Sequence, residues 1–173
     1  QNKDRPTALL LSRQNIAYSA KGTADGEAAA QDAFGLDAIS KGAYVLAEPA
    51  AAGLTKKARA VIIATGSEVP LALAAQAQLA ARKIAVRVVS MPSTTTFDRQ
   101  PAAYQLAVLP QGLPRIAVEM GATGGWWKYG CAAVVGIDSY GESAPAPVLF
   151  KHFGFTADNV AATVEKVLTS GAR

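Results

Sequence analysis

The residue with the clearest chemical potential is an arginine that ends an apolar run. Residues 9–14 read Leu-Leu-Leu-Ser-Arg-Gln, so Arg13 stands between two hydrogen-bonding side chains. A continuous apolar run is typical of a parallel strand buried on both faces, and open α/β sheets bind ligands just beyond the carboxyl ends of such strands. A planar guanidinium held there can grip a phosphate or a carboxylate. The alternative is an arginine that returns to water or pairs with a nearby acid.

A second candidate is the turn that follows the apolar run at 61–64. Gly66, Ser67 and Glu68 open a helical pattern here, and the free backbone N–H groups of a helix start can bind an anion. The turn lacks the further glycines and the lysine of a P-loop, and it is not a full dinucleotide fingerprint. A plain helix cap, with Ser67 at the N-cap position, therefore explains the motif better than a phosphate cradle.

The remaining reactive residues do not assemble into a catalytic set. His152 is the only histidine and Cys131 the only cysteine, so the sequence predicts neither a zinc site of the usual kinds nor a serine–histidine–acid triad. We expect His152 to be partly exposed between Phe150 and Phe153. The aromatic stretch 126–129 indicates an anchor in a core or an interface. These observations predict no catalytic residue and no metal ligand in the chain.

Apolar and helical segments alternate along the chain and must position these residues. Six segments are predicted strands: Thr7–Leu11, Tyr44–Ala47, Val61–Ala64, Ile84–Val89, Ile116–Val118 and Ala132–Ile137. Helices are predicted over 68–83, 99–108 and 156–168. We expect a long surface excursion over 17–37, partly helical near 28–34, and a bend at 141–145 that leads into a short helix. The order of strands and helices indicates a layered α/β fold with a mostly parallel sheet.

The composition narrows the class of protein. A length of 173 residues suits one domain, and the apolar half of the chain excludes a disordered protein. The net charge is +4 and the basic residues are scattered without interleaved aromatics, so we expect no nucleic-acid binding. No apolar run reaches the roughly 20 residues of a membrane span, and no secretory signal is evident. The single cysteine suits a cytoplasmic protein.

Taken in order, the motifs of this chain resemble the C-terminal region of transketolase. The series is Ser12-Arg13-Gln14-Asn15, Lys41-Gly42-Ala43-Tyr44-Val45-Leu46, Ile63-Ala64-Thr65-Gly66-Ser67-Glu68-Val69, Arg87-Val88-Val89-Ser90-Met91-Pro92-Ser93, Phe97-Asp98, Val108-Leu109-Pro110, Val118-Glu119, Trp127-Lys128-Tyr129, Gly141-Glu142-Ser143-Ala144-Pro145 and Phe150-Lys151-His152-Phe153-Gly154-Phe155. An ordered series over nearly the whole chain is more specific than any one motif. The stretch 17–37 departs from the family because it is longer and richer in alanine.

The resemblance implies that residues 1–173 are the third domain of a homodimeric, thiamine-diphosphate-dependent enzyme of the pentose phosphate pathway. It implies a three-layer α/β/α fold with a mostly parallel, mixed sheet of five to six strands. The family transfers a two-carbon ketol unit from a ketose phosphate to an aldose phosphate. Its N-terminal and middle domains hold the cofactor, a divalent metal (Mg or Ca) and the catalytic groups, so this chain is expected to be inactive alone. Arg13 matches the family arginine that contacts the substrate phosphate.

Two other functions fit parts of the sequence. A stand-alone regulatory module that binds an anion or a nucleotide would use the helix start at 66–68. The equivalent domain of a related thiamine enzyme, a dihydroxyacetone synthase or a deoxyxylulose-phosphate synthase, would share the same architecture. The Ser-Arg-Gln and Gly-Glu-Ser-Ala-Pro motifs favour transketolase itself.

Overall fold

The chain forms a mixed sheet that is covered by helices on both faces. The computed structural model describes residues 4, 6–12, 14–16, 35–49, 54–55 and 57–171. The strands in these residues are β1 (Tyr44–Ala47), β2 (Ala60–Ala64), β3 (Val86–Ser90), β4 (Arg115–Val118) and β5 (Cys131–Val135). They lie in the order β1-β3-β2-β4-β5. Strands β3, β2, β4 and β5 are parallel, and β1 pairs antiparallel with β3 at one edge. The predicted α/β class, with a mostly parallel and mixed sheet, is confirmed.

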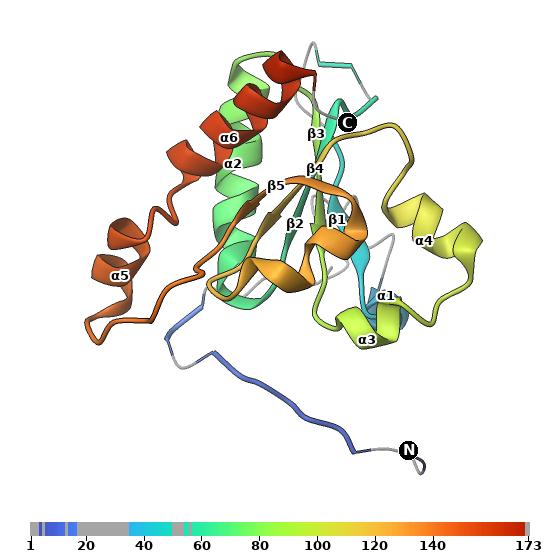
Figure 1. Ribbon diagram of the computed structural model, residues 1–173. Coiled ribbons are helices and arrows are strands. Elements are labelled where there is room, and N and C mark those ends of the chain that lie inside the picture. Colours follow the sequence, from blue (N-terminus) through green and yellow to red (C-terminus); the bar gives the residue numbers. More distant parts are fainter. Residues whose placement is uncertain are drawn as a thin grey trace, which may run out of the picture.

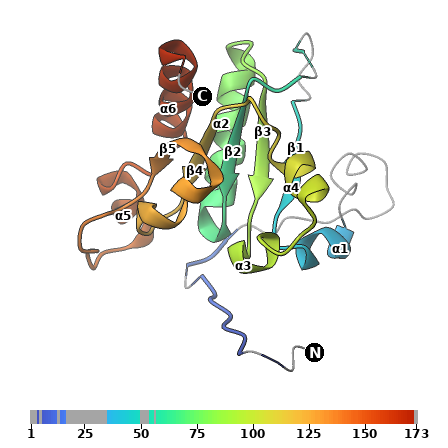
Figure 2. The same cartoon turned by 45° about the vertical axis from the view of Figure 1, so that its right-hand side comes forward.

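The helices of the described residues form the two outer layers. They are α1 (Gly35–Ser40), α2 (Val69–Ala81), α3 (Thr94–Phe97), α4 (Ala102–Val108), α5 (Ala146–His152) and α6 (Ala157–Ser170), with short 3-10 turns η2 (Gly66–Glu68), η3 (Thr123–Gly125) and η4 (Trp127–Tyr129). Helices α2 and α6 pack side by side on one face of the sheet, whereas α1, α3 and α4 lie on the other side (Figures 1 and 2). None of the helices in these residues is long and apolar enough to cross a membrane.

Burial on both faces explains why the central strand is a continuous apolar run. All five residues of β2 are buried, and their side chains alternate between two cores. Ile62 points into the core beneath α2 and α6. Ile63 points into the opposite core, which contains Phe97 of α3 and Tyr129 of η4. The sheet therefore positions whatever follows the carboxyl end of β2.

The helices begin and end where local chemistry dictates. The helix predicted over 99–108 begins only at Ala102, because Pro101 at its N-cap position is extended (ψ 143°). Thr156 caps α6 by accepting a hydrogen bond from the Asn159 amide (3.2 Å), and Gly171 ends it in the left-handed region. The predicted bend at 141–145 does lead into the short helix α5.

The predicted strand over 7–11 is wrong. In the structure this segment is irregular, and the side chains of Leu9, Leu10 and Leu11 are 80–88% exposed. No strand of the described residues pairs with it, because β1 and β5 form the two edges of the sheet. It leads away from the domain, as the blue segment in Figures 1 and 2 shows. The apolar run signalled a need for burial, which the described residues do not meet. The expected excursion over 17–37 falls outside the described residues except for its last three positions, which begin α1.

Candidate functional site

The described part of the predicted site lies where β2 and β4 end side by side. Ala64 and Val118 are register partners at the last position of the two parallel strands, so the residues that follow them emerge at the same edge. Turn η2 follows β2 at this edge, and Glu119 follows β4. Ser12 also reaches it, because a Cβ placed on Gly66 would lie 3.7 Å from the Ser12 hydroxyl oxygen. The topology thus brings Ser12, the helix start and Glu119 together.

The helix start is built differently from the expected cap. Ser67 lies inside η2 and does not cap α2; instead its hydroxyl donates a hydrogen bond to Glu68 Oε1 (3.0 Å). Thr65 is the N-cap residue of η2, and its side chain makes no capping bond. Gly66 adopts a positive φ of 54°, which suits glycine. Pro70 occupies the first turn of α2, where proline is tolerated.

The carboxyl group of Glu68 is itself buried at the helix start, with only 3% of the residue exposed. Burial raises its pKa, and hydrogen bonds from the Ser67 hydroxyl and from the backbone amides of Glu68 and Met120 oppose that rise. A carboxylate in this position interacts favourably with the positive end of a helix dipole. The Glu68 carboxyl group thus occupies the helix start at which the sequence allowed an anionic ligand. Binding of an external anion by Gly66, Ser67 and Glu68 stays a prediction.

Glu119 is the titratable group that the sequence reasoning missed. Burial, followed by the negative charge of Glu68, raises its pKa to about 7. Its Oε2 atom is buried and has no hydrogen-bond partner among the described residues. The signal available in the sequence was a glutamate placed directly after the buried strand 116–118. Nothing in the sequence showed that a second buried carboxyl group would face it.

Arg13, the predicted phosphate-binding residue, lies outside the described residues. Its neighbours Ser12 and Gln14 are described, and of these Ser12 lies beside Gly66. The role of Arg13 therefore stays a prediction.

The other reactive residues take largely structural positions. His152 is exposed at the end of α5, where its ring meets the edge of Phe153 with 4.8 Å between centroids. Cys131 is a buried free thiol, and burial raises its pKa to about 11. Within the described ranges, His, Cys, Asp and Glu side chains do not gather into a group of three that could hold a metal ion.

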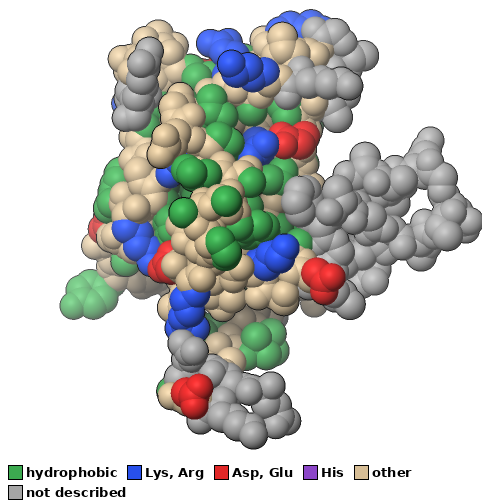
Figure 3. Space-filling view, turned by 90° about the vertical axis from the view of Figure 1, so that its right-hand side faces the viewer, with side chains coloured by type: hydrophobic (Ala, Val, Ile, Leu, Met, Phe, Trp, Pro, Cys, Tyr) green, Lys and Arg blue, Asp and Glu red, His purple; other side chains and the backbone are tan. Residues whose placement is uncertain are grey.

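The aromatic stretch 126–129 serves as the predicted anchor. Trp126 and Tyr129 are buried in the core under α3 and α4, whereas half of Trp127 is exposed. The Tyr129 hydroxyl donates to Asp98 (2.7 Å), which also accepts from Lys128 (2.6 Å). Figure 3 views the face that α1, α3 and α4 cover, and it shows apolar side chains at the centre with charged side chains around them. This network fixes η4 against the end of α3.

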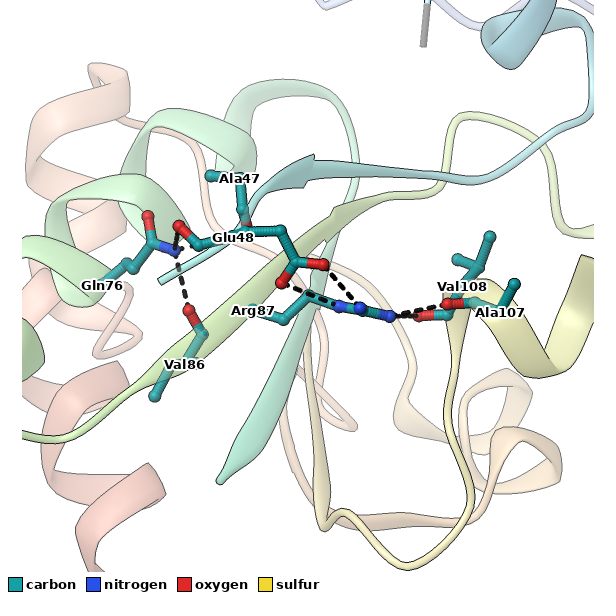
Figure 4. A network of polar contacts seen from close by, with 7 residues as sticks. All are labelled: Ala47, Glu48, Gln76, Val86, Arg87, Ala107 and Val108. Carbon is teal, nitrogen blue, oxygen red and sulfur yellow. Dashed lines mark hydrogen bonds and ion pairs between the residues drawn. The ribbon is translucent and has the colours of Figure 1, made fainter. Parts of the chain in front are cut away.

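A second polar network joins β1, β3 and α4, as Figure 4 shows. Arg87 of β3 binds the Glu48 carboxylate (2.5 and 3.2 Å) and donates to the carbonyls of Ala107 and Val108 at the end of α4. Gln76 of α2 donates to the Val86 carbonyl (2.8 Å). Cations favour helix C-termini, where carbonyls lack partners. These contacts support the fold near the edge strand β1.

A mostly parallel sheet with helices on both faces defines a three-layer α/β domain. The described residues of this domain do not form a complete catalytic set. Comparison with known proteins places that domain. The family model described as "Transketolase-like TK C-terminal domain" matches residues 42–156, and the chain belongs to this family.

Individual relatives agree with the family match. Transketolase 2 of Aliivibrio fischeri is 46% identical over 171 residues, which are 97% of this chain and 24% of the relative. The solved transketolase from Leishmania mexicana is 41% identical with a TM-score of 0.68, over 78% of this chain and 19% of that chain. A transketolase from Pichia stipitis in complex with sedoheptulose-7-phosphate is 42% identical with a TM-score of 0.68, over 75% of this chain and 18% of that chain. This chain thus spans about a quarter of the length of the curated relative.

Proposed function

We propose that this chain is the C-terminal domain of a thiamine-diphosphate-dependent transketolase, which transfers a two-carbon ketol unit between sugar phosphates. The observation that carries the proposal is the 46% identity to a transketolase over 97% of this chain. The comparisons favour neither a stand-alone regulatory module nor a related thiamine enzyme. Because the match spans only 24% of that relative, the reaction belongs to the longer protein.

The described residues do not fit thiamine diphosphate or its metal. A diphosphate and a divalent cation need several oxygen or nitrogen ligands held together. In the part of the chain that the structure describes, His, Cys, Asp and Glu side chains form no group of three that could hold a metal ion. The edge formed by Glu68 and Glu119 offers carboxyl groups rather than cations to a diphosphate. We therefore assign the cofactor, the metal (Mg or Ca) and the reacting groups to the N-terminal and middle domains of the longer protein.

Within that enzyme, Arg13 is the residue proposed to bind the substrate phosphate. A guanidinium forms two parallel, charge-assisted hydrogen bonds with a phosphate. The similar Pichia stipitis transketolase is in complex with a sugar phosphate, sedoheptulose-7-phosphate. A peripheral contact of this kind binds and orients the substrate while the bond-making groups lie elsewhere.

The exposed leucines supply the contact with the rest of the enzyme. Leu9, Leu10 and Leu11 precede the residues that match the family model, and each is at least 80% exposed. Burial of a leucine side chain stabilises a structure by about 1.5–3 kcal/mol. Three adjacent exposed leucines therefore favour packing of this segment against another apolar surface. We propose that segment 7–11 packs against the middle domain, within a cytoplasmic homodimer of the pentose phosphate pathway.

Isothermal titration calorimetry tests this division of labour. We expect the longer protein to bind thiamine diphosphate in the presence of Mg²⁺ and to transfer ketol units, and we expect the 173-residue chain to do neither. Titration of the chain with nucleotides checks the regulatory module. Binding of thiamine diphosphate or transfer by the chain alone contradicts the domain assignment, and tight nucleotide binding favours the module.

A further inference from the structure

We propose that Glu68 and Glu119, two carboxyl groups with buried oxygen atoms at one edge of the sheet, act as one proton-binding unit whose proton holds the start of α2 against the end of β4. Neither the family match nor the proposed function assigns a role to this pair. The proposal rests on the placement of two carboxyl groups at one edge of the sheet.

The strand register forces the two residues together. The last residues of β2 and β4, Ala64 and Val118, are partners in the sheet. Glu119 follows β4 directly, whereas Glu68 ends turn η2, which follows β2 at the same edge. The Glu68 carboxyl group links turn η2 to the residues after β4, because it accepts a hydrogen bond from the backbone amide of Met120. Glu119 is held from the other side, since its amide donates to the Val135 carbonyl of β5 (3.1 Å).

The surroundings of the pair disfavour two negative charges. Glu68 is 3% exposed, and Glu119 Oε2 is a buried oxygen without a hydrogen-bond partner among the described residues. A buried carboxylate without a donor carries a large desolvation cost, whereas the protonated form does not. Two adjacent carboxyl groups in such a site ionise one after the other, and the second ionisation belongs to the pair rather than to one residue.

No ion pair among the described residues involves Glu68 or Glu119. The three ion pairs found there are Arg82–Glu165, Arg87–Glu48 and Lys128–Asp98. The N-terminal segment contributes the neutral Ser12, and η2 contributes the neutral Ser67. Beyond β5, Asp138 is a further acid at this end, and its carboxylate accepts from the amide and the hydroxyl of Thr123 (2.8 Å each). Arg13, next to Ser12 in the sequence, lies outside the described residues. Among the described groups named here, a proton neutralises one carboxyl group without a cation.

The sign of the pH effect follows from this arrangement. The pKa of Glu119 is raised from 4.5 to about 7 in the folded chain, so the folded state binds more protons than the unfolded state between these values. Its contribution to stability is complete below pH 4.5 and is lost as the pH rises to about 7. The unfolding equilibrium constant rises by up to about tenfold per pH unit in this window. Because Glu119 is partly exposed to water, which screens charge, we expect about 10- to 100-fold in total.

NMR titration of the carboxyl carbons in the full chain tests the proposal without a substitution. We expect one carboxyl group of the pair to titrate near pH 7. In Glu68→Gln, the resonance of Glu119 should titrate at lower pH, because the neighbouring negative charge is removed. Titration of both groups near their ordinary pKa of 4.5 overturns the proposal.

Urea unfolding between pH 5 and pH 8 gives an independent measurement. Glu119→Gln should reduce the loss of stability over this range, because the amide keeps the shape of the protonated side chain but does not ionise. Glu142→Gln is the matched control, since Glu142 is exposed; this variant should keep the pH dependence of the unsubstituted chain. If Glu119→Gln and Glu142→Gln have the same pH dependence, the pair is not the proton-binding unit.

Discussion

Gly42 is a position at which the structure predicts a large effect from one methyl group. It lies between α1 and β1 with a φ of 86°. Its carbonyl accepts from the Ser93 amide (2.9 Å), so the two backbones are in direct contact. A Cβ at this position would lie 2.5 Å from both Phe97 N and Ser93 O, and 2.8 Å from Thr96 Cβ. Two of these three atoms belong to the backbone and cannot move aside as a flexible side chain does.

The cost of Gly42→Ala has two parts. The left-handed backbone costs about 1–2 kcal/mol for any residue with a Cβ. Overlap with the fixed backbone of α3 costs about 1–3 kcal/mol more, as for other overpacked sites. We therefore expect a loss of about 2–5 kcal/mol, against a total stability of about 5–15 kcal/mol for a typical domain.

Urea unfolding followed by circular dichroism measures this loss. Gly112→Ala is the matched control, because Gly112 also has a positive φ (77°) but no atom lies within 4 Å of its added Cβ. That variant should lose only the backbone part of about 1–2 kcal/mol. The reasoning is refuted if Gly42→Ala costs no more than Gly112→Ala, since the close approach to α3 would then carry no energy.

Two further predictions concern the edge network and the exposed leucines. Arg87→Ala should lower the free energy of unfolding, measured with urea, by about 1.5–3 kcal/mol. Most of this loss should come from the hydrogen bonds to the carbonyls at the end of α4, because the Glu48 side chain is half exposed. A loss no larger than that of Arg59→Ala, a variant of an exposed arginine before β2, would contradict this expectation. Leu10→Ser should change the stability of the 173-residue chain by less than about 0.5 kcal/mol, yet destabilise the longer protein by about 2 kcal/mol or more. Equal effects on both proteins would remove the reason for placing segment 7–11 in an interface.

The sheet was predictable from the sequence because most of its strands are short apolar runs. The segments at 44–47, 61–64, 116–118 and 132–137 became β1, β2, β4 and β5, with bounds shifted by at most two residues. The run Leu9–Leu11 is not a strand, because an apolar run indicates a preference for burial but not the secondary structure in which the residues are buried. Helix α4 started late because Pro101 stops the helical pattern at a point that periodicity alone did not mark.

The site was less predictable because it depends on contacts between distant residues. Gly66, Ser67 and Glu68 were recognised as a helix start, but the sequence did not show that Glu68 turns inward. The sequence places Glu119 after a buried strand, but its raised pKa depends on burial next to Glu68, 51 positions earlier in the chain. The bond between Asp98 and Tyr129, 31 residues apart, was invisible for the same reason. Local sequence patterns predict helices and strands, whereas contacts between residues that are distant in the sequence become visible only in the folded structure.

The central claim, that this domain serves a sugar-phosphate transferase through Arg13, is tested most directly by substrate discrimination in the longer protein. A charge-assisted contact contributes about 1.5–3 kcal/mol, so Arg13→Ala should lower kcat/KM for phosphorylated acceptors by about 10- to 100-fold. Non-phosphorylated acceptors should change little, and Arg59→Ala should affect neither. Equal losses for phosphorylated and non-phosphorylated acceptors would contradict the account.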